Sequence, residues 1–234
     1  MQAIPLENPD IRDCKELLSV MAEENCQCEG MAYEMFRGLS LNTNDKDWLS
    51  NNQIRYDITR IPGKIICGEW IKTKGHYHPS APDGFAYTEI YEVLEGEALY
   101  LLQKQDLSDI ILVRARTGDL VLIPPGYGHV TINPSNQTLL MANLVSSAFS
   151  SDYVPFEKMR GAAYYYYADG GVKKNKKYPE NLPPVREVTC HGKQLPLPFP
   201  QQNLYSCIGD EKSLKFLNKP GSFTEAYQKL YLFT

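Results

Sequence analysis

The sequence has few histidines, no excess of basic residues and no long apolar run. Its 24 lysines and arginines are outnumbered by 28 aspartates and glutamates, which gives a net charge of −4. A general nucleic-acid binder carries a basic face, so this balance argues against that class. No stretch approaches the length of a transmembrane helix, and the N-terminus lacks a basic start followed by an apolar segment. We therefore expect a cytoplasmic protein that binds neither nucleic acid nor membrane.

Cysteine spacing gives no sign of a zinc ribbon or a C-x-x-C redox pair among the six cysteines. Cys26 and Cys28, which one residue separates, are the only close pair. In a reducing compartment, free thiols explain this pair more simply than a special role. We therefore predict free thiols here.

Short β-rich runs, broken by turn residues, extend from about Tyr56 to Val145. Regular short strands without helical segments between them are typical of an all-β sandwich or small barrel. Further upstream, apolar residues within Asp10–Glu24 recur at roughly helical spacing, which predicts a short amphipathic helix. The stretch Asn42–Asn52 is rich in Asn, Asp and Ser, and we expect a loop there, with at most a helical turn.

Histidine is concentrated in two short stretches of the chain. Of the four histidines, His76 and His78 lie in the sequence Thr-Lys-Gly-His-Tyr-His, which begins at Thr73. Successive side chains of a strand point to opposite faces, so the two imidazoles share one face and Tyr77 takes the other. Two imidazoles on one strand face make half of a metal site. His191 lies outside both stretches, and we expect it to be an ordinary surface histidine.

The stretch Gly118–Asn133 fits the pattern G-x5-P-x-G-x2-H-x3-N at every fixed position. This pattern resembles the second sequence motif of the cupin superfamily. The first cupin motif, G-x5-H-x-H-x3,4-E-x6-G, is matched by the H-x-H pair and by Glu89 with Gly96. Trp70 stands where the leading glycine is expected, and a longer spacer precedes Glu89, which a loop insertion explains. Asp83 has the ordinary spacing but lacks the later glycine, so Glu89 is preferred.

The cupin resemblance implies an all-β fold, a jelly-roll-like β-barrel, and a metal site in it. Three neutral imidazoles and one carboxylate suit a divalent transition metal, with octahedral geometry leaving two positions open. Water or two substrate oxygens can take open positions, which a catalytic metal needs. Fe²⁺ is the preferred ion, with Mn²⁺, Ni²⁺ or Zn²⁺ as alternatives. The implied ligands are His76, His78, Glu89 and His129.

The flanking residues resemble a narrower family, the cupin-type phosphoglucose isomerases of archaea and some bacteria. T-K-G-H-x-H followed by E-x-Y is the specific match, and the resemblance extends over roughly Met31 to Tyr153. It implies a metal-dependent isomerase of glucose 6-phosphate and fructose 6-phosphate, in which Glu89 moves a proton between C2 and C1 through a cis-enediol. A metal-assisted hydride shift is the competing mechanism. The implied phosphate contacts are Thr59, Thr73 and Gly75, and the implied sugar contacts are Tyr33 and Tyr91.

Two positions depart from that family. Where its pocket has a tyrosine and a histidine, this chain has Val145 and Ser151. Either a nearby residue such as Tyr153 substitutes for them, or the substrate differs from glucose 6-phosphate. Lys74 could add positive charge near the phosphate, although strand alternation can equally turn it away. Two other functions stay open, an Fe(II)-dependent cupin dioxygenase and a non-catalytic sugar-binding cupin.

We expect residues 1–30 to form an N-terminal helical segment and residues 31–170 to form the cupin barrel. Residues 171–234 would be a C-terminal extension packed on the barrel, and the family resemblance does not explain its last part. The expected partner is a small sugar phosphate. A homodimer is also expected, because edge strands of such barrels are usually paired or covered and the resemblance implies a dimer too.

Overall fold

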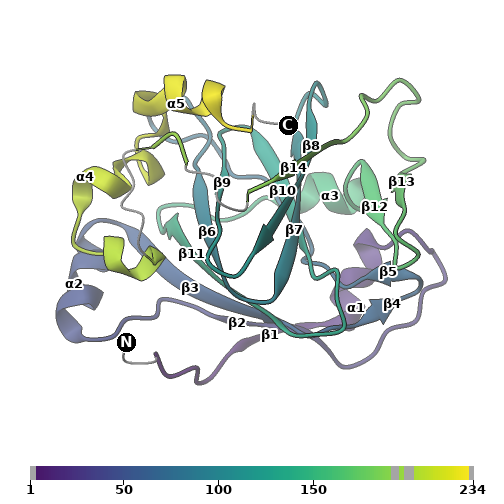
Figure 1. The fold of residues 1–234 in the computed structure, drawn as a ribbon, viewed down its shortest axis with the longest axis horizontal. Helices are drawn as coiled ribbons and strands as arrows, with labels where there is room; N and C mark the ends of the chain where they lie inside the picture. Colours follow the sequence, from purple (N-terminus) through teal and green to yellow (C-terminus); the bar gives the residue numbers. More distant parts are fainter. Residues whose placement is uncertain (1–3, 191–194, 198–202, 232–234) are drawn as a thin grey trace.

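The computed structural model describes residues 4–190, 195–197 and 203–231. Two main β-sheets pack against each other (Figure 1). One sheet has six strands, all antiparallel to their neighbours, in the order β1–β2–β3–β11–β6–β9. The other has four strands in the order β10–β7–β8–β14, with β14 parallel to β8. Among the described residues no strand pairing joins the two sheets into a closed barrel, so the all-β, jelly-roll-like fold that was predicted takes a two-sheet form.

The strand bounds follow the sheet order. The six-stranded sheet contains β1 (Asp10–Asp13), β2 (Met31–Phe36), β3 (Ile54–Ile61), β11 (Leu139–Ser146), β6 (Glu89–Glu95) and β9 (Leu120–Ile123). The four-stranded sheet contains β10 (Tyr127–Ile132), β7 (Glu97–Lys104), β8 (Ile110–Arg116) and β14 (Arg186–Thr189). Two small hairpin-like pairs accompany them, namely β4 (Ile65–Ile66) with β5 (Glu69–Trp70) and β12 (Tyr164–Tyr166) with β13 (Val172–Lys174).

Helical segments are short and lie outside the sheets. The α-helices are α1 (Cys14–Leu17), α2 (Thr43–Asn51), α3 (Val154–Lys158), α4 (Glu211–Leu214) and α5 (Thr224–Lys229). The 3₁₀ turns are η1 (Leu18–Val20), η2 (Leu204–Cys207), η3 (Lys215–Leu217) and η4 (Pro220–Phe223). No helix in the described part of the chain is both long enough and apolar enough to cross a membrane.

The hydrophobic core fills the space between the sheets and continues beyond β7. Nearly all residues of β7 and β8 are buried on both faces, which explains their almost continuous apolar sequence. On the outer face of β7, the Gln103 side chain hydrogen-bonds the hydroxyls of Tyr77 and Tyr178 and the backbone N–H of Ala163. The segment around α3 and β12 therefore packs on this sheet and shields its outer face from water.

The C-terminal segment, which contains the helices α4 and α5 at the left of Figure 1, packs on the outer face of the six-stranded sheet. The ring of Tyr205 packs edge-on against Tyr56 of β3, and the backbone N–H of Leu204 donates to the Glu92 carboxylate of β6. The hydroxyl of Tyr231 is hydrogen-bonded to the backbone of Leu122 in β9. The region that the sequence leaves unexplained is thus tied to the sheet by specific polar contacts.

Two local predictions need correction. The expected helix over Asp10–Glu24 is shorter than predicted, since α1 and the 3₁₀ turn η1 follow a strand, Asp10–Asp13, that pairs with β2, and Asp13 caps α1 in a capping box. The expected loop Asn42–Asn52 contains the nine-residue helix α2, which the Asn42 side chain caps by accepting from the N–H of Asp45.

The cysteines also differ from the sequence expectation. Disulfides join Cys14 to Cys28 and Cys26 to Cys67, so the prediction of free thiols was wrong for this cluster. Three of these cysteines lie in the N-terminal segment, and Cys67 lies in the turn between β4 and β5. The second disulfide therefore joins the N-terminal segment to the β4–β5 pair. Disulfides are typical of oxidising compartments, so a cytoplasmic location stays a prediction that these bonds do not favour.

Candidate functional site

Backbone pairing with β10 places the H-x-H segment. The N–H of His76 donates to the carbonyl of His129 over 3.3 Å, and the N–H of His129 donates back over 3.1 Å. His76 and His129 are therefore direct neighbours, although they lie 53 positions apart in the sequence. Tyr77 points to the opposite face, where its ring lies 5.1 Å from that of Phe156. This is the alternation that the sequence pattern predicts.

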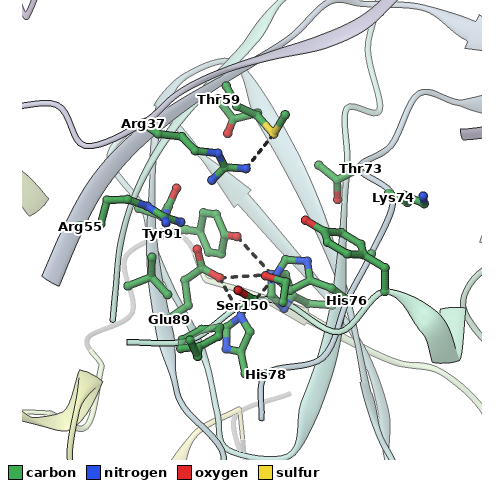
Figure 2. A pocket seen from close by; sticks show the side chains of 18 of the residues that line it. Arg37, Arg55, Thr59, Thr73, Lys74, His76, His78, Glu89, Tyr91 and Ser150 are labelled. Atoms are coloured by element: carbon green, nitrogen blue, oxygen red, sulfur yellow. Dashed lines mark hydrogen bonds and ion pairs between the residues drawn. The ribbon is translucent and has the colours of Figure 1, made fainter. Parts of the chain in front are cut away.

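The three histidines meet the Glu89 carboxylate at the start of β6, and Figure 2 shows His76 and His78 beside Glu89. One ligand atom from each of the four side chains lies within 4.8 Å of all the others. The Nε2 atoms of His76 and His78 are 3.2 Å apart, and Glu89 Oε2 lies 3.3 Å from Nε2 of His78 and 3.4 Å from Nε2 of His129. The structure thus brings together all four residues that the sequence proposes as metal ligands.

Neighbouring groups set the orientation of these rings. Nδ1 of His78 lies 3.0 Å from the carbonyl of Tyr87, which can only accept, so the proton sits on Nδ1 and the Nε2 lone pair faces the cluster. The hydroxyl of Tyr91 lies 3.1 Å from Nε2 of His129. Nδ1 of His129 is buried and has no hydrogen-bond partner among the described residues. Such a convergence of nitrogen lone pairs on one carboxylate is chemically suited to a cation.

Electrostatics favour the metal-binding protonation states. Burial, with smaller contributions from the neighbouring His129 and His78, holds the pKa of His76 well below its usual range. Burial also lowers the pKa of His129, against the opposing effect of Glu89. Burial alone would raise the pKa of Glu89, but the neighbouring His129 and His78 outweigh it and hold that pKa well below its usual range. Neutral imidazoles and an ionised carboxylate are the forms that bind metal, so these residues fit a divalent transition ion.

The cluster lines a cavity of ≈ 310 Å³, within the range of small-molecule sites. Strands of both sheets and the loops beside them form its wall. Every residue that the sequence proposes as a substrate contact lies on this wall, namely Tyr33, Thr59, Thr73, Lys74, Gly75, Tyr91 and Tyr153. The cavity is therefore of small-molecule size and is lined by hydroxyls as well as by the cluster.

The segment before the H-x-H pair is held tightly at this wall. Thr73 Oγ1 accepts the backbone N–H of Thr131 over 2.9 Å, which fixes its side chain and leaves its own proton free to be donated. Gly75 has φ +77°, and a Cβ there would meet Cγ2 of Val130 at 2.6 Å. Both the conformation and the space therefore require glycine. The ammonium of Lys74 pairs with the Glu157 carboxylate of α3.

Several residues of the cavity wall were missed by the sequence reasoning. They are Met35, Arg37, Arg55, Met141, Asn143, Ser146, Phe149 and Ser150. A usable signal existed for Arg55, because it shares a strand face with Thr59 at the period of two that marks one side of a sheet. Val145 and Ser151, the two departures from the family pattern, also line the cavity. Asp83 lies outside the cluster and accepts from the backbone N–H of Gly221, while His191 lies outside the described residues.

Comparison with known proteins gives one matching family. A family model of glucose-6-phosphate isomerase (GPI) matches residues 11–183. The glucose-6-phosphate isomerase of Thermococcus litoralis is 30% identical over 92 residues, which is 39% of this chain and 45% of the relative. That of Thermococcus onnurineus (strain NA1) is 29% identical over 113 residues, or 48% of this chain and 56% of the relative. The chain spans about half the length of the curated relatives that it matches.

Comparison with solved structures finds a distant likeness to enzymes that act on oxalate. A recombinant oxalate oxidase in complex with glycolate has 18% identity and a TM-score of 0.40, over 53% of this chain and 56% of that one. The Lactobacillus farciminis oxalate decarboxylase formate complex has 18% identity and a TM-score of 0.39, over 55% of this chain and 32% of that one. Likeness at this level carries no information about the reaction.

Proposed function

Because the chain belongs to the glucose-6-phosphate isomerase family, we propose that it is a metal-dependent enzyme that interconverts glucose 6-phosphate and fructose 6-phosphate. One observation carries the proposal beyond family membership. Three imidazoles and one carboxylate converge at the wall of a cavity that also presents threonine hydroxyls and tyrosines. Such a set suits a sugar phosphate that must be bound, oriented and deprotonated in one place.

The proposed metal ligands are His76, His78, Glu89 and His129. The preferred ion is Fe²⁺, and Mn²⁺, Ni²⁺ and Zn²⁺ are alternatives with the same ligand chemistry. When bound, such an ion supplies Lewis-acid stabilisation of negative charge that develops on sugar oxygens. The carbonyl of Tyr87 keeps the His78 ring in the orientation and tautomer that a ligand needs.

Hydroxyl and backbone groups are proposed to bind the substrate. Thr59, Thr73 and Gly75 would face the phosphate, with the Thr73 proton free to be donated because its oxygen already accepts from Thr131. Glycine at 75 lets a phosphate oxygen approach the backbone closely. The sugar would lie against the tyrosines of the wall, which are Tyr33, Tyr91 and Tyr153.

Glu89 is proposed as the group that moves the proton. Its side chain is buried and its pKa is held well below the usual range, so it is ionised at neutral pH and can accept a proton from C2 and return it to C1 through a cis-enediol. A hydride shift between the two carbons is the competing route. Turnover in deuterated water separates them, because solvent deuterium at the transferred position supports the enediol and counts against the hydride shift.

The assay for the proposal is turnover of fructose 6-phosphate by metal-loaded protein, with dissolved oxygen recorded in the same vessel. We expect glucose 6-phosphate to form without oxygen consumption. Substrate-dependent oxygen uptake would instead indicate a dioxygenase. Ligand binding with neither turnover nor oxygen uptake would indicate a sugar-binding protein and refute the isomerase.

A homodimer is part of the proposal. β1 is the edge strand of the six-stranded sheet, and Ile11 and Met31 beside this edge are 50% and 41% exposed. A second copy would cover this edge and these apolar side chains. Sedimentation at micromolar concentration checks it, and a monomer at all concentrations would refute it.

A further inference from the structure

The positive charge at the cavity wall does not come from Lys74 alone, as the sequence suggested. Three cationic side chains line it in the described part of the chain, namely Arg37, Arg55 and Lys74. The charge of Lys74 is matched by the carboxylate of Glu157. Recognition of an anionic substrate must therefore rely on the two arginines more than on the lysine beside the H-x-H segment.

A single buried carboxylate holds both arginines. Nε of Arg55 lies 2.9 and 2.7 Å from the two oxygens of Asp57, and Nη1 of Arg37 lies 3.1 Å from one of them. The backbone N–H of Gly38 also donates to Asp57, over 2.9 Å. Asp57 itself is only 1% exposed. The two guanidinium groups are thus fixed in position before any ligand arrives, which reduces the ordering cost of binding.

The arginines keep donor capacity for a ligand. Arg55 uses only Nε, and its two terminal amino groups have no hydrogen-bond partner among the described residues. Within the part of the chain that the structure describes, the one hydrogen bond of Arg37 Nη2 goes to the sulfur of Met35, a weak acceptor. The two side chains are 36% and 34% exposed, so a ligand can reach them. Two positive charges stand against the one negative charge of Asp57, while Asp10 near Arg37 is largely exposed and screened by water.

Strand register places Arg55 at the level of the proposed reaction centre. Across β3, β11 and β6, Arg55 pairs with Val145, which in turn pairs with Glu89. The short side chain of Val145 therefore stands between them in this row of the sheet. A larger residue there would stand between the Arg55 guanidinium and the cavity.

We propose that Arg37 and Arg55 form an anion subsite that binds oxygens of an acidic group on the sugar substrate. The planar guanidinium donors match the oxygens of phosphate and carboxylate groups. In Figure 2 the pair lies across the cavity from Thr73 and Lys74. The acidic group is either the phosphate of the substrate or a second acidic group on the same sugar. The identity of the ligand as a sugar phosphate rests on the proposed function. The existence of the subsite rests on the geometry of the two arginines alone.

The test compares Arg55→Gln with a matched control on the same strand. Arg60→Gln removes a guanidinium from the other face of β3, where Arg60 pairs with Glu34 and does not line the cavity. If Arg55→Gln melts at a lower temperature than the control, Arg55→Lys replaces it in the test. Lysine keeps a positive charge beside Asp57 but lacks the planar donors of a guanidinium. Calorimetric titration of each protein uses inorganic phosphate, fructose 6-phosphate and 6-phosphogluconate, a phosphorylated sugar acid.

We expect Arg55→Gln to weaken binding about 10-fold or more, with Arg55→Lys also weakened and Arg60→Gln unchanged. Equal losses for all three ligands would assign the subsite to the phosphate. A loss confined to 6-phosphogluconate would assign it to a second acidic group. Affinities in both Arg55 variants equal to those of the control would overturn the subsite, as would wild-type protein that binds none of the three. Turnover is measured separately, so wild-type protein that binds but does not isomerise refutes the proposed function and leaves the subsite standing.

Discussion

Gly75 allows the packing of the H-x-H segment to be tested quantitatively. Its φ of +77° is a conformation that disfavours an L side chain, and a Cβ would lie 2.6 Å from Cγ2 of Val130 and 3.0 Å from the ring of Phe156. The substitution Gly75→Ala therefore combines two separate costs, one in the backbone and one in packing. Gly84 has φ +86°, and no described atom outside its chain neighbours lies within 4 Å of the place a Cβ would take, so Gly84→Ala carries the backbone cost alone.

The expected magnitudes follow from these two positions. A left-handed conformation costs an L residue about 1–2 kcal/mol. Inserting a methyl group into a packed region adds about 1–3 kcal/mol. We therefore expect Gly84→Ala to lower the free energy of unfolding by about 1–2 kcal/mol, and Gly75→Ala by about 2–5 kcal/mol. Each kcal/mol corresponds to about 2–4 °C in melting temperature for a chain of this size.

Urea unfolding of the two variants and the wild type measures the difference directly. Gly75→Ala should also raise KM for fructose 6-phosphate, since Thr73 and His76 share its displaced backbone, while Gly84→Ala should leave KM unchanged. Equal stabilities of the two variants would refute the packing argument. An unchanged KM in a destabilised Gly75→Ala would refute the link between this turn and the substrate.

Three further predictions concern charge and covalent structure. Glu89→Gln keeps the shape of the carboxylate, and a coupled assay should show kcat lowered about 10²–10⁴-fold; an unchanged kcat would remove Glu89 from proton transfer. In metal-stripped protein, the lowered pKa of His76 means that the unfolded chain takes up protons first, so the free energy of unfolding should fall as the pH drops below about 6.5. The fall should be smaller in His76→Ala, and equal pH profiles would contradict the assignment. The disulfide Cys26–Cys67 joins residues 41 apart, and Cys67→Ser should lower the free energy of unfolding by about 2–5 kcal/mol; equal stability in the two proteins would show that the bond does not form in solution.

The sequence allowed the cluster to be predicted because its members lie in two spaced motifs. His76 and His78 are two residues apart, so strand periodicity alone places them on one face, while Glu89 and His129 were proposed from the resemblance to the two cupin motifs. The arrangement of the strands around them also followed from regular short β-rich runs. These features depend on the residues themselves and on their neighbours in the sequence.

Other features depend on partners that are distant in the sequence. Asp10–Asp13 is a strand only because β2 lies beside it, and the pairing of Cys26 with Cys67 requires the folded chain. The anion-binding role proposed for Arg55 depends on two contacts. Asp57 on the same strand holds its guanidinium, and Val145 on the neighbouring strand leaves it open to the cavity. Periodicity could have marked Arg55 as facing the cavity, but not that a buried carboxylate would hold it there.

A metal titration of stripped wild-type protein and of His129→Ala, followed by turnover of fructose 6-phosphate at each point, tests the proposed centre most directly. We predict that wild type binds one divalent ion per chain and that turnover rises with occupancy, with Fe²⁺ restoring it best. His129→Ala should stay folded, bind the ion far more weakly and show no turnover. Full turnover by stripped wild-type protein, or equal metal binding by the two proteins, would contradict the assignment of the four side chains to a catalytic metal centre.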